Sequence, residues 1–174
     1  ECCSWKEIEV IFNLVLFLLF TGFFLYGFFH YKDKNDELSK NVTNQFLSAL
    51  LTPFGTFSRW YLSRFNGSIT KKNWEWLPIG TFMANMIASI ISVLSVAINT
   101  KLVPPSYILT SAFLGAIKSG YAGTFSTVST FAAETTGLFK ALPRYFWGYY
   151  YSFGSLFIAL ILGICSYAWT TIVV

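Results

Sequence analysis

Charged side chains are scarce in this sequence. Lys, Arg, Asp and Glu make up only 11% of the 174 residues, whereas apolar residues make up 55%. Water-soluble proteins usually carry about a quarter charged residues. The apolar residues also come in runs long enough to cross the roughly 30 Å hydrocarbon layer of a bilayer. The composition therefore predicts an integral membrane protein in contact with lipid.

Residues that carry hydrolytic or redox chemistry are also few. His30 is the only histidine, no acidic residue lies in the middle of an apolar run, and the glycines form neither a P-loop nor a dinucleotide-binding fingerprint. Cys2 and Cys3 are adjacent and Cys165 lies in an apolar stretch, which does not suggest a disulfide framework. There is no basic stripe interleaved with aromatic residues. These absences argue against an enzyme and against a nucleic-acid partner.

Five apolar segments predict five membrane-spanning helices. They occupy residues 10–30, 46–65, 77–98, 105–131 and 145–174. The first segment is apolar on every side, as expected for a helix that faces lipid, and a polar loop follows it. We therefore expect an all-α integral membrane protein with two parts, a linker helix and its loop in residues 1–44 and a four-helix unit in residues 45–174.

The fourth segment is unusual in its middle. From Lys118 to Thr127 the sequence KSGYAGTFST is rich in glycine and hydroxyl residues at mid-membrane depth. Unwound backbone persists at that depth only where protein buries it or where it lines a wet cavity. We therefore predict a broken helix. We expect Gly123 to lie at the break, where a β-branched residue would not be tolerated.

Uncharged hydrogen-bond donors gather in the third and fourth segments. Asn85 lies in the third, and the predicted break is surrounded by Thr124, Ser126, Thr127, Ser129 and Thr130. An amide, hydroxyls and freed backbone N–H groups can replace the hydration shell of a small anion. Alternatively, these hydroxyls bond back to helix carbonyls or pack between helices. The residues alone leave both interpretations open.

Three motifs in this sequence resemble those of one family, in the same order. Residues 120–134, GYAGTFSTVSTFAAE, resemble the broken-helix signature of the fluoride channels, the bacterial CrcB (Fluc) proteins and their eukaryotic FEX relatives. Two further motifs resemble Gly-x-x-x-Arg in the family's first helix and Gly-Thr-x-x-x-Asn in its second, at Gly55, Arg59, Gly80, Thr81 and Asn85. Together with the last segment, the resemblance covers about residues 46–174.

The resemblance implies a passive, fluoride-selective channel that exports fluoride from the cytosol. Such channels consist of two four-helix units of opposite orientation, and the eukaryotic relatives join the two through an extra helix, which residues 10–30 resemble. The implied partners are fluoride, a homologous inverted N-terminal half, fused or separate, and the lipid bilayer. Because the sequence begins with Glu1 and not with Met, we expect it to be part of a longer polypeptide. It resembles the C-terminal half of a fused fluoride exporter.

The resemblance also assigns roles to individual residues. The implied pore-lining residues are Asn85, Thr127, Ser129, Thr130, Phe131, Tyr151 and Ser155. The backbone carbonyls of Gly123 and Ser126 would hold a structural sodium ion, and no catalytic cofactor is implied. Structural roles fall to Gly55, Arg59, Gly80 and Thr81, with Arg59 bonding near the end of its helix.

The sequence departs from the family pattern at four positions. Val128 stands where the family has its first pore phenylalanine, and Thr124 and Ala88 replace glycines. Lys118 lies about one turn before the break. Its ammonium would either snorkel to the surface or lie near the sodium position.

The distribution of Lys and Arg favours an orientation with residue 1 in the cytosol and the C-terminus outside. We expect the protein to lie in the plasma membrane. Two other classes of function stay open. A proton-coupled small-solute exporter needs an intramembrane acid, and the candidate is Glu134, which we expect at a helix end, capping it or facing a loop. A non-transporting assembly subunit would leave Asn85 and the hydroxyl residues without a role.

Overall fold

Helices account for nearly all of the described backbone. The computed structural model describes residues 5–31, 37–67, 74, 76–141 and 146–173, and no strand occurs among them. The elements are α1 (Trp5–Tyr31), α2 (Glu37–Ser63), α3 (Ile79–Lys101), α4 (Ile108–Ala116), the π-helical segment η1 (Ile117–Ala122), α5 (Gly123–Phe125), α6 (Val128–Lys140) and α7 (Phe146–Val173). The predicted all-α class is confirmed.

Three helices of the described chain are long and apolar enough to cross a membrane, over Glu9–Gly27, Ile79–Lys101 and Phe146–Ile172. The helix α2 is also 27 residues long, but its first part is polar. We expected that part to belong to a loop, and this was wrong, because α2 already begins at Glu37. Residues such as Glu37 and Lys40 favour helix, and Phe46 anchors this end by packing its ring against Gly27 of α1.

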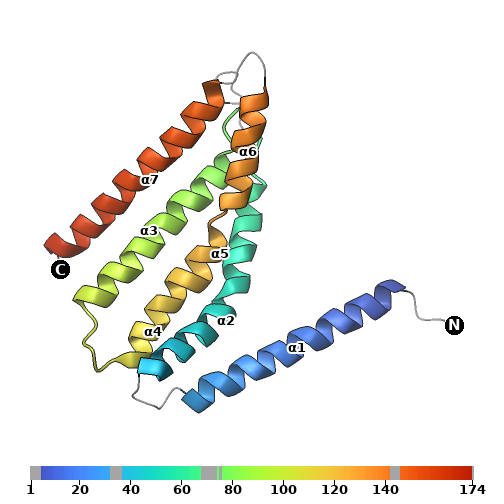
Figure 1. Ribbon diagram of the computed structural model, residues 1–174, viewed down its shortest axis with the longest axis vertical. Coiled ribbons are helices and arrows are strands. Elements are labelled where there is room, and N and C mark those ends of the chain that lie inside the picture. Colours follow the sequence, from blue (N-terminus) through green and yellow to red (C-terminus); the bar gives the residue numbers. More distant parts are fainter. Residues whose placement is uncertain (1–4, 32–36, 68–73, 75, 142–145, 174) are drawn as a thin grey trace.

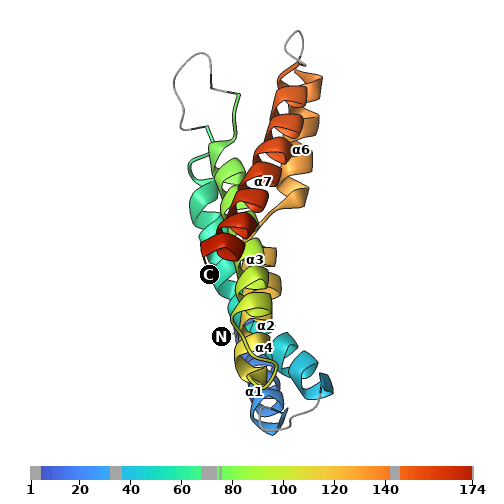
Figure 2. The same cartoon turned by 90° about the vertical axis from the view of Figure 1, so that its left-hand side faces the viewer.

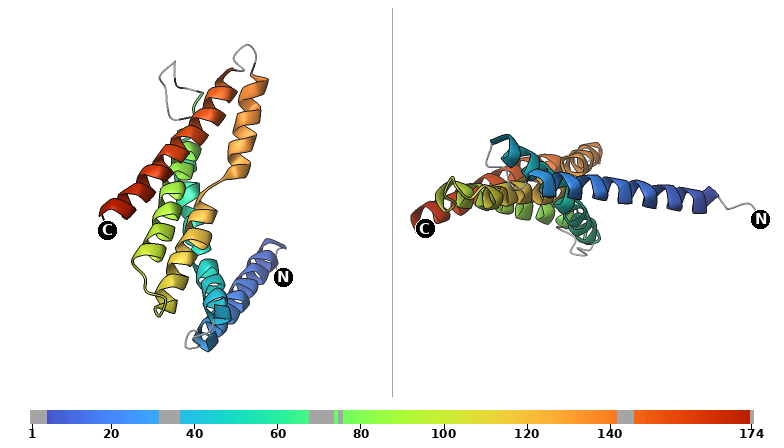
Figure 3. Two further views of the ribbon diagram at one scale, coloured as in Figure 1. Left: turned by 60° about the vertical axis from the view of Figure 1, so that its left-hand side comes forward. Right: turned by 90° about the horizontal axis from the view of Figure 1, so that it is seen from below.

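The helices form a layered bundle from which α1 diverges. Helices α2, α3 and the α4–η1 segment lie side by side, and α7 runs along α3 (Figure 1). Beyond the break, α6 changes direction and lies beside α7 (Figure 2). Among the described helices α1 packs against α2 alone, and it projects away from the others in the view from below (Figure 3). This arrangement leaves most of α1 free to contact lipid.

Small residues bring the helices of the bundle close together. A β carbon added at Gly55 would overlap the Tyr121 carbonyl, one at Gly80 the Leu62 carbonyl, and one at Gly120 the backbone of Ser48. A central cluster consists of the buried residues Ala84, Ala88, Ala122 and Phe125. Since lipid tails are as apolar as these side chains, close van der Waals packing is the force that holds such helices together.

The interruption between α5 and α6 falls at Ser126 and Thr127. Their ψ angles are 153° and 93°, whereas Gly123 is helical, with φ −63° and ψ −37°. A β carbon at Gly123 would meet only the Lys118 carbonyl oxygen, at 3.7 Å. Our expectation that Gly123 lies at the break was therefore wrong for this chain, and a β carbon has room at this position. The break lies at Thr127 because its side chain caps α6 by accepting a hydrogen bond from the N–H of Thr130.

Candidate functional site around the helix break

Asn85 of α3 connects the break to the bundle. Its Oδ1 accepts a hydrogen bond from the backbone N–H of Thr127 at 2.7 Å. In an unbroken helix that N–H would pair with the carbonyl of Gly123, which here accepts a bond from the hydroxyl of Ser126 at 3.1 Å. The oxygen of the Asn85 amide thus stabilises the break. Its NH₂ group has no acceptor among the described residues and remains available to a ligand.

A cavity of about 330 Å³ lies beside Asn85, between α3, α6 and α7. Its lining consists of Asn85, Met86, Ser89, Ser126, Val128, Phe131, Ser155, Leu156 and Ala159, none of which is charged. Ser155 is only 7% exposed, and its Oγ has no hydrogen-bond partner in the described chain. An unsatisfied buried hydroxyl costs about 1–3 kcal/mol. The α3–α6–α7 cavity therefore offers two uncharged donor groups, those of Asn85 and Ser155, next to the ring of Phe131.

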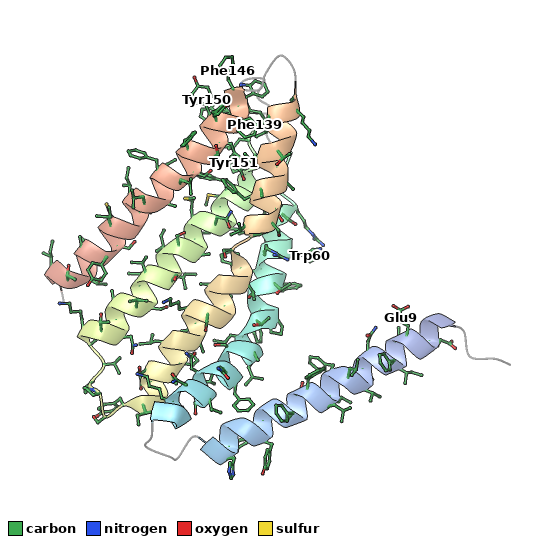
Figure 4. All side chains as sticks on the ribbon, viewed as in Figure 1. Glu9, Trp60, Phe139, Phe146, Tyr150 and Tyr151 are labelled. Carbon is green, nitrogen blue, oxygen red and sulfur yellow. The ribbon has the colours of Figure 1, made fainter. Side chains whose placement is uncertain are left out.

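Tyr151 packs against Phe131, which lines this cavity, but is not itself part of the lining. The residue is 1% exposed, and its ring centroid lies 5.0 Å from that of Phe131. Its hydroxyl donates a hydrogen bond to Oε2 of Glu134 at 2.9 Å. Figure 4 shows Tyr151 between α7 and α6, whereas Phe139, Phe146 and Tyr150 gather where these two helices meet at the end of the molecule. Tyr151 thus fixes the position of Phe131.

Glu134 is the centre of a hydrogen-bond network that sequence reasoning missed. Its Oε1 accepts bonds from the Thr81 hydroxyl at 2.7 Å and from the Asn66 amide at 3.1 Å, in addition to the Tyr151 bond at Oε2. Asn66 also accepts from the Thr81 N–H at 3.1 Å. We expected Glu134 at the end of a span, capping the helix or facing a loop. It does not cap α6, which continues to Lys140, but it bonds to Asn66 in the turn after α2. No local signal could have revealed the network, since Asn66 and Glu134 are 68 residues apart in sequence.

A second cavity, of about 290 Å³, lies between α2, α3 and α6. Its lining consists of Thr56, Arg59, Trp60, Ser63, Gly80, Thr81, Ala84, Thr127 and Thr130. The residues predicted to line one pore are thus divided. Phe131 and Ser155 line the first cavity, Thr127 and Thr130 line the α2–α3–α6 cavity, and Ser129 is exposed and lines neither.

The outer side of the break faces an open groove of about 780 Å³ between α3, η1 and α7. Gly123 and Ser126 line this groove together with Lys118, its only charged residue. Val128 is 76% exposed. The hydroxyl of Thr124, by contrast, donates a hydrogen bond to the Gly120 carbonyl at 2.5 Å. Thr124 therefore fits the alternative interpretation, in which hydroxyl side chains bond back to helix carbonyls.

These features define an all-α integral membrane protein with uncharged hydrogen-bond donors placed at a helix break. Residues 46–167 match the family model described as CrcB-like protein, Camphor Resistance (CrcB). The chain belongs to this family. The family assignment also points to a transporter and not to an enzyme.

Two curated relatives match most of this unit. The chain is 32% identical over 125 residues to the fluoride-specific ion channel FluC of Thermosipho melanesiensis, covering 67% of this chain and 93% of that protein. It is 32% identical over 130 residues to fluoride export protein 1 of Candida albicans, covering 71% of this chain and 32% of that protein. Most of the Candida albicans protein therefore lies outside the match.

Proposed function

We propose that this chain is the fluoride-conducting unit of a passive channel that exports fluoride from the cytosol. The observation that carries the proposal is the uncharged α3–α6–α7 cavity, where the NH₂ of Asn85 and the hydroxyl of Ser155 have no acceptor among the described residues and lie next to Phe131. The names of the two relatives, a fluoride-specific ion channel and a fluoride export protein, support fluoride as the ion.

The chemistry of this cavity suits a small anion that must leave as easily as it enters. An amide N–H, a hydroxyl and the positive edge of an aromatic ring each replace part of an anion's hydration shell. Because none of the lining residues is charged, the anion is attracted without being held as a tight ion pair. Conduction requires this balance between entry and release.

A second, homologous half in inverted orientation would complete the channel. The exposed Val128 and the open groove with Lys118 present surfaces at mid-membrane depth that a partner would cover. The length of the Candida albicans relative beyond the match leaves room for such a half in one polypeptide. Helix α1, which is apolar and packs on α2 alone among the described helices, would then be the linker that inverts one half relative to the other.

The proposed location is the plasma membrane, with residue 1 in the cytosol and the C-terminus outside. This orientation places on the cytosolic side the basic residues Lys6, Arg64, Lys71, Lys72, Lys140 and Arg144. An excess of Lys and Arg in short loops marks the cytosolic side. Fluoride would therefore enter the channel from the end at which Glu134 and Tyr151 lie.

The freed backbone at the break supports the proposal of a structural sodium ion. Thr127 donates its N–H to Asn85, so the Gly123 carbonyl loses its helical donor, and Ser126 leaves helical geometry. Carbonyls of unwound helices bind sodium in membrane transporters. Gly123 and Ser126 would hold the ion in this chain. Lys118 lines the same groove, and its ammonium would compete with sodium for these carbonyls.

Glu134 is better placed to stabilise the structure than to carry protons. Its carboxylate accepts three hydrogen bonds from three segments of the chain, which a proton-coupled exporter would have to break in each cycle. We therefore assign Glu134 a structural role. An assembly subunit without transport would leave the buried hydroxyl of Ser155 unexplained.

Fluoride efflux from liposomes tests the proposal. The complete polypeptide is reconstituted with a potassium ionophore and equal pH on both sides, and fluoride and chloride efflux are recorded with ion-selective electrodes. We expect rapid fluoride efflux, and chloride efflux at the level of protein-free vesicles. Equal efflux of both ions, or efflux that requires a pH gradient, would contradict the proposal.

A further inference from the structure

Asn66 caps helix α3 from a different segment of the chain. The first N–H groups of a helix need acceptors, but the residue that precedes α3 is Pro78, which forms no side-chain cap bond. The Oδ1 atom of Asn66 accepts the N–H of Thr81, the third residue of α3, at 3.1 Å. Asparagine often caps a helix from the position just before it. Here the cap comes from the turn after α2.

The amide nitrogen of Asn66 joins a second helix to this cap. Its Nδ2 donates to the Thr81 hydroxyl at 3.0 Å and to Oε1 of Glu134 at 3.1 Å. The Thr81 hydroxyl donates to the same Oε1 at 2.7 Å. The neutral amide thus uses its acceptor on α3 and its two donors on α3 and α6. Aspartate, of nearly the same shape, could make the first bond but not the other two.

Glu134 extends this network to the α3–α6–α7 cavity. Its second oxygen, Oε2, accepts the hydroxyl of Tyr151 at 2.9 Å. Tyr151 is buried between α6 and α7 (Figure 4), and its ring centroid lies 5.0 Å from that of Phe131. Because packing and this hydrogen bond together hold Tyr151, a shift of Glu134 would displace the ring against which Phe131 packs.

We propose that Asn66 is a positioning residue of the channel: its neutral amide holds Glu134 against the start of α3 and thereby, through Tyr151, keeps the aromatic ring of the conduction path in place. The inference rests on the proposed function. Asn66 lines neither the α3–α6–α7 cavity nor the α2–α3–α6 cavity, so it acts on the ion only through other residues. The property that matters is its lack of charge beside a carboxylate.

An aspartate in place of Asn66 would convert this contact into a pair of carboxylates. At about pH 8.5 both would be ionised and would repel each other, whereas at about pH 6 a proton shared by the pair would restore a hydrogen bond. The other titratable groups around Glu134 and the turn are the phenol of Tyr151 and the guanidinium groups of Arg59 and Arg64, which keep their protons over this range. The variant should therefore work better in acid.

The test compares Asn66→Asp with Asn44→Asp in the complete protein, by fluoride efflux from liposomes. Asn44 lies near the other end of α2, where its Oδ1 accepts the Ser48 hydroxyl at 3.2 Å and no carboxylate is recorded as its partner. We expect efflux through Asn66→Asp to be about tenfold below the wild type at about pH 8.5 and within about twofold of it at about pH 6. The wild type and Asn44→Asp should show no pH dependence once the leak of protein-free vesicles is subtracted.

Exchanging the two groups supplies a second readout. In the double variant Asn66→Asp with Glu134→Gln, the carboxylate lies in the turn and the amide on α6, so the amide–carboxylate bond forms again. Tyr151 keeps an acceptor, the amide oxygen. We expect the double variant to regain most of the wild-type efflux and to lose the pH dependence. If Asn66 only filled space, the double variant would be at least as impaired as Asn66→Asp.

Two results would overturn the inference. One is an equal pH profile for Asn66→Asp and Asn44→Asp, and the other is a double variant no better than Asn66→Asp. If Asn66→Asp does not fold, the double variant decides, because an exchange that fails to restore folded protein also overturns the inference. Wild-type protein that conducts no fluoride overturns the proposed function instead. Melting temperatures of the same proteins over this pH range would then still test whether Asn66 holds Glu134.

Discussion

The two halves of the interrupted helix differ in what their side chains do. Before the break, α4 and η1 bury a row of small residues, Ser111, Ala112, Ala116, Gly120 and Ala122. After the break, α6 has no fully buried residue, yet it carries Thr130, Phe131 and Glu134. The first half serves packing, and the second half presents side chains to cavities.

This division explains how a membrane protein can keep unwound backbone at depth. Close packing of α4 and η1 against α2 and α3 fixes where the chain enters the break. Asn85 then accepts the freed N–H of Thr127, and the Thr127 hydroxyl accepts that of Thr130, which hydrocarbon could not do. The side chains of α6 are consequently available for an ion, since other contacts hold the backbone.

The largest effect should come from adding one methyl group to the packing half. In Gly120→Ala the new β carbon would overlap the backbone of Ser48 on α2. Because backbone cannot rotate away, we expect a loss of about 3 kcal/mol or more. Gly137→Ala in α6 is the matched control, since a β carbon there meets nothing within 4 Å.

Size-exclusion chromatography and thermal unfolding in detergent measure this difference. Gly120→Ala should give little monodisperse protein, whereas Gly137→Ala should resemble the wild type. Similar yields and melting temperatures for the two variants would show that the halves do not differ in packing as described.

A smaller effect is expected from the aromatic residue in the functional half. Phe131 lines the cavity beside Asn85, and an aromatic edge contact is worth about 1 kcal/mol. Phe131→Ile should therefore lower fluoride efflux about five- to tenfold. Val128→Ile is the control and should change fluoride efflux little, because Val128 has no ring to lose. Val128→Phe tests whether an added ring opens a second conduction path.

The experiment is the liposome assay at equal amounts of folded protein. It distinguishes one dominant conduction path, which uses Phe131, from two equivalent ones. If Phe131→Ile retains about half or more of the wild-type efflux, a dominant path through this ring is excluded.

Local composition predicted the class of fold and the region of the break. Glycine and hydroxyl residues at membrane depth between Lys118 and Thr127 are a local signal, and apolar runs indicate spans. The position of the break was not predictable in this way. It depends on Asn85, which is 42 residues from Thr127 in sequence, so glycine content pointed to Gly123 instead.

The sequence indicated candidate residues but not how they are arranged. Asn85, Phe131 and Ser155 line one cavity, whereas Thr127 and Thr130 line another. A sequence shows which residues are polar and does not show which neighbouring helix each one meets. The network of Glu134, Asn66 and Tyr151 was missed for the same reason, because its members lie on separate segments.

The most direct test of fluoride passage past Asn85 is fluoride efflux through Asn85→Asp. Aspartate keeps the oxygen that accepts the Thr127 N–H, so the break should persist and the melting temperature should match the wild type. It loses the NH₂ donors and places a negative charge in the anion's path. We predict folded protein whose fluoride efflux equals that of protein-free vesicles. Efflux at the wild-type rate would contradict the assignment of this cavity as the conduction path.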